Sequence, residues 1–238
     1  IWNPSFTSGG EGRPTSTYFL DFGDKNIKRV AYAVSFGCVN YPERAFNIAK
    51  NHVRSFDAIS VREDSGLNIV SKLGFRSPIK LPDPTLLLKA SDYVFPVDNT
   101  INNDNSKVAF FYMLRNEQSR VKSLELYLQS SYKLISADEK FKPLSLEEWI
   151  RGIKNASIVI TNSFHGMCFS LIFHIPFIVI PAIGKAGSMN DRFFTLLSYL
   201  NLEDRMMSEY DVNKTNSLIS NDIDWKNVDE KINNLKME

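Results

Sequence analysis

The chain has 238 residues, of which 43% are hydrophobic and 23% charged, a composition typical of a globular protein with one large or two small domains. The formal net charge is +1 and both signs are interspersed, which excludes a general electrostatic attraction to nucleic acid or to an anionic membrane. The sequence has neither a run of roughly 18 apolar residues nor a signal-peptide pattern, so we expect a cytoplasmic protein without an integral membrane segment.

The first part of the chain predicts strands that alternate with helices. Short apolar runs rich in β-branched residues are typical of strands, and apolar residues spaced three or four apart are typical of helices. The expected strands cover 28–36, 57–61 and 79–88, and the expected helices cover 42–56 and 62–74. This alternation predicts a parallel sheet covered by helices. The opening "IWNPSFTSGGEGRPTS" has no Met and resembles the exit of a strand, so we expect part of this domain to precede Ile1.

Residues 89–106 are polar, rich in Asn and Asp, and lack any periodicity, which is typical of a linker. We therefore predict an incomplete first domain over 1–88, a linker over 89–106 and a second domain over 107–238. In the second domain the strand and helix pattern restarts. Its expected strands cover 107–114, 132–137, 157–163 and 176–181, and its expected helices cover 116–130, 144–156, 165–174, 190–201 and 224–237.

The strongest candidate site follows the predicted strand 157–163. Ligands of parallel α/β sheets bind where the carboxyl ends of strands meet helix N-termini. Asn162 and Ser163 end this strand, Ser163 is a good helix N-cap, and Gly166 would let an anion approach the first helical turn. His165 lies in that turn, where an imidazole can donate a proton or bind a phosphate. The alternative is a buried histidine bonded to a backbone carbonyl.

Other strand ends carry charged residues. Arg62 and Glu63 follow the strand 57–61, Asp83 lies between two prolines, and Arg115 follows the strand 107–114. An arginine at such a position suits a carboxylate or a phosphate, because its planar fork donates two parallel hydrogen bonds. The alternative for each arginine is an ion pair, and for each carboxylate a helix cap or a pairing with arginine.

The segment 181–202 combines glycines with Lys185 and Arg192 before an apolar helix, and resembles an anion-binding loop without matching a P-loop. No Cys and His spacing for zinc and no nucleophile-elbow or dinucleotide-binding motif is present. We therefore expect no metal. Cys38 and Cys168 are expected to be reduced and buried.

Five segments, in this order, resemble the polysaccharide pyruvyl transferase family. They are "IWNP", "YAVSFG", "ISVREDSG", "LPDPTLLL" and "ITNSFHGMCFSLIFHIPFIVI". The resemblance implies two Rossmann-like domains with parallel sheets, similar to GT-B glycosyltransferases, with the active site in the cleft between them. It implies an acceptor side in the first domain and a donor side in the second.

The same resemblance implies an activity. Members transfer the enolpyruvyl group of phosphoenolpyruvate to two hydroxyls of a sugar, making a pyruvate ketal and releasing phosphate, with no cofactor. The acceptor would be a cell-surface polysaccharide or its precursor, finished or lipid-linked, handled in the cytoplasm or at the inner face of the membrane.

The family's functional histidine falls on His165. Some relatives carry an arginine where this chain has Ser163, so Arg62, Arg115, Lys185 and Arg192 become the candidates for holding the donor. We take His165 as the acid or the phosphate stabiliser, and Glu63 or Asp83 as the residue that orients an arginine. Two alternatives stay open: a glycosyltransferase that uses a nucleotide sugar, and a non-enzymatic sugar-binding protein.

Overall fold

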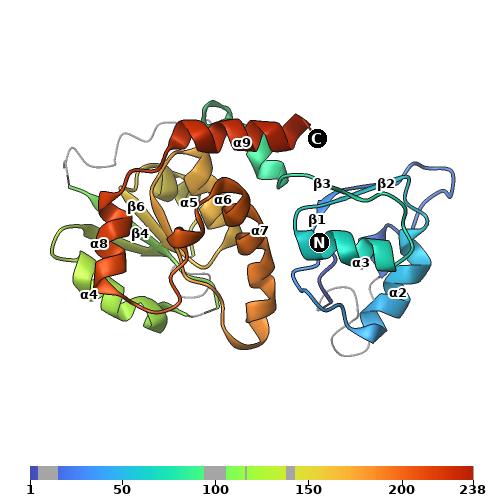
Figure 1. The fold of residues 1–238 in the computed structure, drawn as a ribbon, viewed down its shortest axis with the longest axis horizontal. Coiled ribbons are helices and arrows are strands. Elements are labelled where there is room, and N and C mark those ends of the chain that lie inside the picture. The colour runs from blue at the N-terminus through green and yellow to red at the C-terminus, as the bar shows by residue number, and fades with distance from the viewer. Residues whose placement is uncertain (5–15, 94–105, 116, 138–142, 238) are drawn as a thin grey trace. The chain divides into compact units, whose positions relative to one another are not determined.

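The structure is a computed structural model, and it describes residues 1–4, 16–93, 106–115, 117–137 and 143–237. The chain divides into two compact units (Figure 1). The first unit comprises Ile1–Leu87, Ile183–Asn201 and Lys231–Glu238, and the second comprises Leu88–Ala182 and Leu202–Glu230. The first unit therefore includes residues 183–201, which the sequence assigned to the second domain.

The first unit is built on a three-stranded parallel sheet in the order β1-β2-β3. The strands are β1 (Val30–Val34), β2 (Ala58–Val61) and β3 (Ile79–Lys80), and the helices are α2 (Glu43–Val53), α3 (Asp64–Lys72) and α7 (Asp191–Leu200). Trp2 lies in the core, with its ring centroid 5.0 Å from that of Phe19, 5.7 Å from Phe36 and 5.2 Å from Phe56. This aromatic cluster packs beneath the end of β1.

A bulge interrupts β1 just before its carboxyl end. The register with β2 shifts between Ala31 and Val34, and Ala33 adopts a left-handed φ of 45°. The Ser60 hydroxyl repairs the interrupted ladder, because it accepts a hydrogen bond from the Ala33 N–H at 2.7 Å and donates one to the Ala31 carbonyl at 3.3 Å. Bulges re-aim the chain that follows them, and here that chain is the loop beginning at Ser35.

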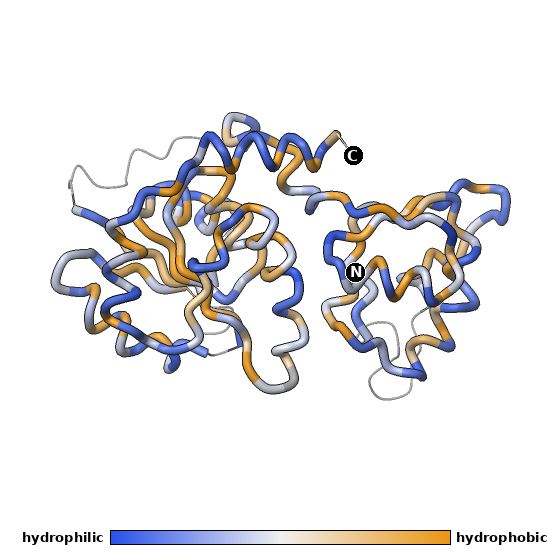
Figure 2. Tube along the Cα trace, in the orientation of Figure 1, coloured by the Kyte–Doolittle hydropathy of each residue, from blue (hydrophilic) through white to orange (hydrophobic). Residues whose placement is uncertain are grey.

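The second unit holds a four-stranded parallel sheet in the order β5-β4-β6-β7. Its strands are β4 (Val108–Tyr112), β5 (Lys133–Ala137), β6 (Ile158–Thr161) and β7 (Phe177–Val179). Its helices are α4 (Lys122–Leu128), α5 (Leu146–Lys154), α6 (Phe164–Ile172) and α8 (Val212–Ser220), while α9 (Trp225–Met237) begins in this unit. The strands are hydrophobic along most of their length (Figure 2), as expected of a sheet buried on both faces.

Helices cover both faces of this second sheet (Figure 1). On one face α4 and α8 pack against strand residues such as Phe111 and Ile160. On the other face α5 lies so close to β4 that a Cβ at Gly152 would come within 2.6 Å of the Phe110 ring. Both faces are buried, which explains the continuous apolar runs of the sequence.

The predicted α/β class with parallel sheets is confirmed, two local predictions are corrected, and one helix is additional to those expected. The expected strand 79–88 is limited to Ile79–Lys80 and gives way to a 3₁₀ helix over Pro84–Leu87, because Pro82 and Pro84 have no N–H for the ladder. The helix expected over 116–130 is a 3₁₀ turn over Gln118–Val121 followed by α4. Helix α8 was not predicted.

Most of the predicted linker 89–106 and most of the opening loop lie outside the described residues. Within the described ranges, every helix is too short or too polar to span a lipid bilayer.

Candidate functional site

The predicted site residues fall into two groups, one at the carboxyl ends of the strands of each unit. The first unit carries Arg62, Glu63, Asp83 and Arg192, and the second carries Arg115, Asn162, Ser163, His165 and Gly166. Lys185 lies in the 3₁₀ segment Gly184–Asn190 of the first unit, and its side chain is outside what the structure describes.

His165 lies in the first turn of α6, directly beyond the end of β6, and its side chain is exposed. Ser163 is the N-cap, as predicted: its hydroxyl accepts a hydrogen bond from the Gly166 N–H at 3.2 Å. Thr161 braces the same turn, because its hydroxyl donates to the Tyr112 carbonyl at 2.7 Å and accepts from the Ser163 N–H at 2.9 Å. The imidazole is thus carried on a turn held by strand and cap together.

Gly166 has a packing role in this turn. A Cβ at this position would approach the Thr161 hydroxyl oxygen to 2.7 Å, so the glycine lets α6 sit directly on β6. The side of Gly166 on which a Cβ would stand is therefore occupied by Thr161.

Asn162 organises the loop that follows β4. Its Oδ1 accepts a hydrogen bond from the Leu114 N–H at 2.7 Å, and its Nδ2 donates to the Leu114 carbonyl and to Glu117 Oε2, each at 3.2 Å. Arg115, which follows Leu114 in the chain, is exposed and adopts a left-handed φ of 61°. Such a conformation is unfavourable for a residue with a Cβ and persists where its surroundings impose it. Asn162 thus positions the backbone from which Arg115 projects.

Arg120 belongs to this edge and was missed by the sequence analysis. Its guanidinium donates to Glu117 Oε2 at 2.6 Å and to the Pro181 carbonyl at 2.9 Å, which ties the loop after β4 to the end of β7. The spacing of Glu117 and Arg120, three residues apart, was the available signal, but nothing in the sequence indicated the contact with Pro181.

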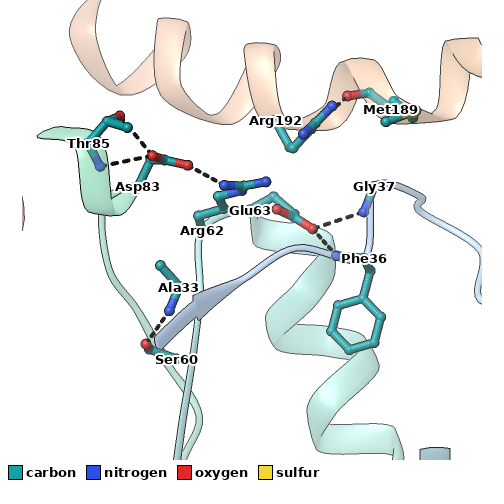
Figure 3. Close-up of polar contacts among 10 residues, drawn as sticks. All are labelled: Ala33, Phe36, Gly37, Ser60, Arg62, Glu63, Asp83, Thr85, Met189 and Arg192. Carbon is teal, nitrogen blue, oxygen red and sulfur yellow. Dashed lines mark hydrogen bonds and ion pairs between the residues drawn. The ribbon is translucent and has the colours of Figure 1, made fainter. Parts of the chain in front are cut away.

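In the first unit, Arg62 forms a buried ion pair with Asp83 (Figure 3). The arginine side chain is 10% exposed and the aspartate side chain 1%. The other carboxylate oxygen of Asp83 accepts hydrogen bonds from the Thr85 N–H at 3.0 Å and the Thr85 hydroxyl at 2.8 Å. Asp83 therefore holds the Arg62 guanidinium through one oxygen and is itself held by Thr85 through the other.

Glu63 is fully buried and contacts backbone (Figure 3). Its Oε1 accepts hydrogen bonds from the Phe36 N–H at 2.6 Å and from the Gly37 N–H at 3.2 Å. Burial raises the pKa of the Glu63 carboxyl, although the hydrogen bond from Gly37, the charge of Arg62 and the hydrogen bond from Phe36 oppose that rise. Asn3, which the sequence analysis did not select, holds the same loop from the other side.

Arg192 lies at the start of α7, is 8% exposed, and donates through Nε to the Met189 carbonyl at 3.3 Å (Figure 3). Helix α7 begins against α3, because Asp191 accepts a hydrogen bond from the Ser65 hydroxyl. The predicted Arg192 therefore joins Arg62 and Glu63 at one end of the first sheet.

Both cysteines are free and buried. Burial raises the pKa of the Cys38 thiol to about 11, so this thiol is protonated at neutral pH and is a poor nucleophile. No group of three or more potential metal ligands occurs within the described parts of the chain.

Comparisons with known proteins identify the family. A search of curated proteins returns no significant match. The family model described as polysaccharide pyruvyl transferase matches residues 4–182, which is well over half of the chain and includes the segment that carries His165. The chain therefore belongs to the polysaccharide pyruvyl transferase family.

Proposed function

We propose that the protein transfers the pyruvyl group of phosphoenolpyruvate to two hydroxyls of a polysaccharide or its precursor, forming a cyclic pyruvate ketal. Membership of the family supports the reaction class. The observation that carries the proposal is the exposed His165 in the first turn of α6, at the carboxyl end of a buried parallel strand. The amide dipoles and the imidazole of such a turn favour a small anion.

The reaction needs one proton donor and a site for the departing phosphate. The methylene carbon of phosphoenolpyruvate takes a proton, which leaves an oxocarbenium-like centre at the neighbouring carbon. Two sugar hydroxyls attack this centre, the C–O bond to phosphate breaks, and the two hydroxyl protons balance the protonated methyl group and the released hydrogen phosphate. Protonated His165 serves as the acid or as the stabiliser of the phosphate.

The charges of the two units suit different substrates. In the second unit the exposed Arg115 and His165 can meet a carboxylate and a phosphate. In the first unit the charge of Arg62 is balanced by Asp83, which suits a neutral sugar better than a trianion. We therefore assign the donor to the second unit and the acceptor to the first. Because Lys185 and Arg192 belong to the first unit, we propose them as candidates for acceptor rather than donor binding.

Ligand-dependent thermal stability tests the donor. Phosphoenolpyruvate should raise the melting temperature, because a ligand at 100 times its Kd stabilises the folded state by about 2.7 kcal/mol. UDP- and GDP-sugars should leave it unchanged. Stabilisation by a nucleotide sugar alone would replace the proposal with glycosyl transfer, and the same residues would need new roles.

Replacement of His165 tests the chemistry. His165→Asn should lower the rate of phosphate release in the presence of acceptor by roughly 10²–10⁴, the usual contribution of a general acid. His174→Asn is the matched control: His174 follows the same helix, adopts a left-handed φ of 55° that asparagine tolerates, and stacks on Trp225. Full activity in His165→Asn would disprove the assigned role.

A further inference from the structure

The peptide between Phe36 and Gly37 is held on both sides by buried side chains. Asn3 Nδ2 donates to the Phe36 carbonyl at 2.9 Å and to the Gly37 carbonyl at 3.4 Å. Glu63 Oε1 accepts from the N–H groups of the same two residues. Asn3 is 8% exposed and Glu63 0%. Two side chains thus satisfy both donors and both acceptors of one short loop segment.

Asn3 and Glu63, together called the clamp below, leave room only for glycine at position 37. Gly37 has a φ of 59°, and a Cβ there would lie 2.9 Å from Asn3 Nδ2. The Ser188 hydroxyl also donates to the Gly37 carbonyl, at 3.4 Å. Both the conformation and the close contacts therefore fix the loop as it leaves β1.

The second carboxyl oxygen of Glu63 lies beside the Ser35 hydroxyl. Among the described residues, Glu63 Oε2 and the neighbouring Ser35 hydroxyl are buried without a hydrogen bond of standard geometry. The Ser35 hydroxyl nevertheless lies close enough to Glu63 to oppose the rise of its pKa. A protonated carboxyl would carry its hydrogen on Oε2, where it can be donated to Ser35. Burial raises the pKa of the Glu63 carboxyl.

The loop emerges from the clamp at Val39 and Asn40, which are exposed. An apolar side chain beside an amide suits the faces and hydroxyls of a neutral sugar. The charges that follow the neighbouring strand β2, Arg62 paired with Asp83, balance each other. We infer that Val39 and Asn40 form a subsite for the acceptor sugar, and that Glu63 and Asn3 are positioning residues that hold this subsite in place. The inference rests on the proposed function, because it names where the acceptor binds.

Steady-state kinetics with matched variants test the subsite. Glu63→Gln keeps an acceptor for the two N–H groups and gains a donor toward Ser35, so kcat and both KM values should stay within about twofold of wild type. Glu63→Ala and Asn3→Ala should raise the acceptor KM about tenfold and leave the donor KM unchanged, as expected when hydrogen bonds that only position a binding loop are lost. A loss of kcat of about 100-fold or more in Glu63→Gln would make Glu63 a catalytic acid or base and overturn the inference.

Asn40→Ala tests the subsite without touching the core. It should raise the acceptor KM alone, whereas an unchanged acceptor KM would overturn the assignment.

Hydrogen exchange tests the clamp independently of activity. The Phe36 and Gly37 amides should be protected in wild type and in Glu63→Gln, and should exchange faster in Glu63→Ala. Fast exchange in wild type would overturn the clamp. If wild type neither binds phosphoenolpyruvate nor releases phosphate from it, the proposed function fails while the exchange result still stands or falls separately.

The pH dependence of stability gives a second independent readout. Because the pKa of Glu63 is raised in the folded state, the folded protein retains a proton that the unfolded chain releases, and stability falls as pH rises from the unfolded value of about 4.3 toward the folded pKa. Glu63→Gln lacks this loss. Its melting temperature relative to wild type should therefore rise as the pH increases above about 4.3, and a constant difference would contradict a raised pKa of Glu63.

Discussion

Asn162, Glu63 and Asp83 share one property at the scale of the single residue. Each lies at the carboxyl end of a strand, where polar residues suggest ligand binding, yet each satisfies a neighbouring group of the protein. Among the predicted residues whose side chains the structure describes, His165 and Arg115 are exposed. The buried residues hold loops in place, and the exposed residues are the candidates for contact with substrate.

The Arg62–Asp83 pair gives the first stability prediction. Asp83→Asn should destabilise the protein by about 3–5 kcal/mol, because it leaves the arginine charge buried without its counter-charge. The control is Lys80→Gln, which breaks the pair between Lys80 and Asp64, whose side chains are 26% and 61% exposed. That exposed pair should contribute about 1 kcal/mol or less. Urea unfolding measures both, and equal losses would contradict the difference in burial.

At the scale of the element, helix α5 begins with a capping box. The Ser145 hydroxyl accepts from the Glu148 N–H at 3.2 Å, and Glu148 Oε2 accepts from the Ser145 N–H at 2.8 Å. These bonds satisfy donors that a helix N-terminus otherwise leaves open. They also lower the pKa of Glu148, through the backbone and then the hydroxyl of Ser145.

Ser145→Ala should cost about 1 kcal/mol of stability, and Ser145→Thr, which keeps the hydroxyl, should cost much less.

The lowered pKa of Glu148 also predicts that the stability of the protein depends on pH. The contribution of Glu148 is present above its unfolded pKa and is lost as the pH falls through the lower folded value, so wild type and Glu148→Gln should converge in stability at acid pH. Urea unfolding between about pH 7 and pH 3 measures this, and a constant difference would contradict the role of the box.

Elements also show where sequence patterns were insufficient. The proline-bounded segment 79–88 is apolar like a strand, but β3 ends at Lys80. The Leu81 N–H still donates to the Val61 carbonyl, and Pro82 then has no N–H to continue the ladder. Helix α8 buries only Thr215 and Leu218 and is otherwise polar, so its apolar periodicity was too weak to predict. Stronger apolar periodicity identified α2, α5 and α7. Helix α2 buries three residues and α7 five, and the two that α5 buries, Ile150 and Ile153, are both apolar.

At the scale of the whole molecule, each unit has its own hydrophobic core. The chain passes between the units several times, because residues 183–201 and 231–238 return to the first. A single domain boundary along the sequence cannot represent this division. Local composition indicates a linker, but it does not indicate that a later segment packs in the first unit.

Separate cores predict separable unfolding. Leu73→Ala in the first core and Leu124→Ala in the second remove the same atoms from sites that are 0% and 1% exposed, and each should cost about 2–5 kcal/mol. Calorimetry should show that each substitution lowers one transition and leaves the other in place. A single transition that moves with both variants would show that the two cores unfold together.

The sequence by itself determined the α/β class, the order of most elements, the N-cap at Ser163 and the family, because periodicity, capping and short motifs are local properties of the chain. Only the tertiary structure decided which polar residues face solvent and which hold the backbone. Glu63 and Asn3 are 60 positions apart in the chain, yet both form hydrogen bonds with the backbone of Phe36 and Gly37. Such pairings depend on strand order and on a bulge in β1, and these arise from packing across the whole unit.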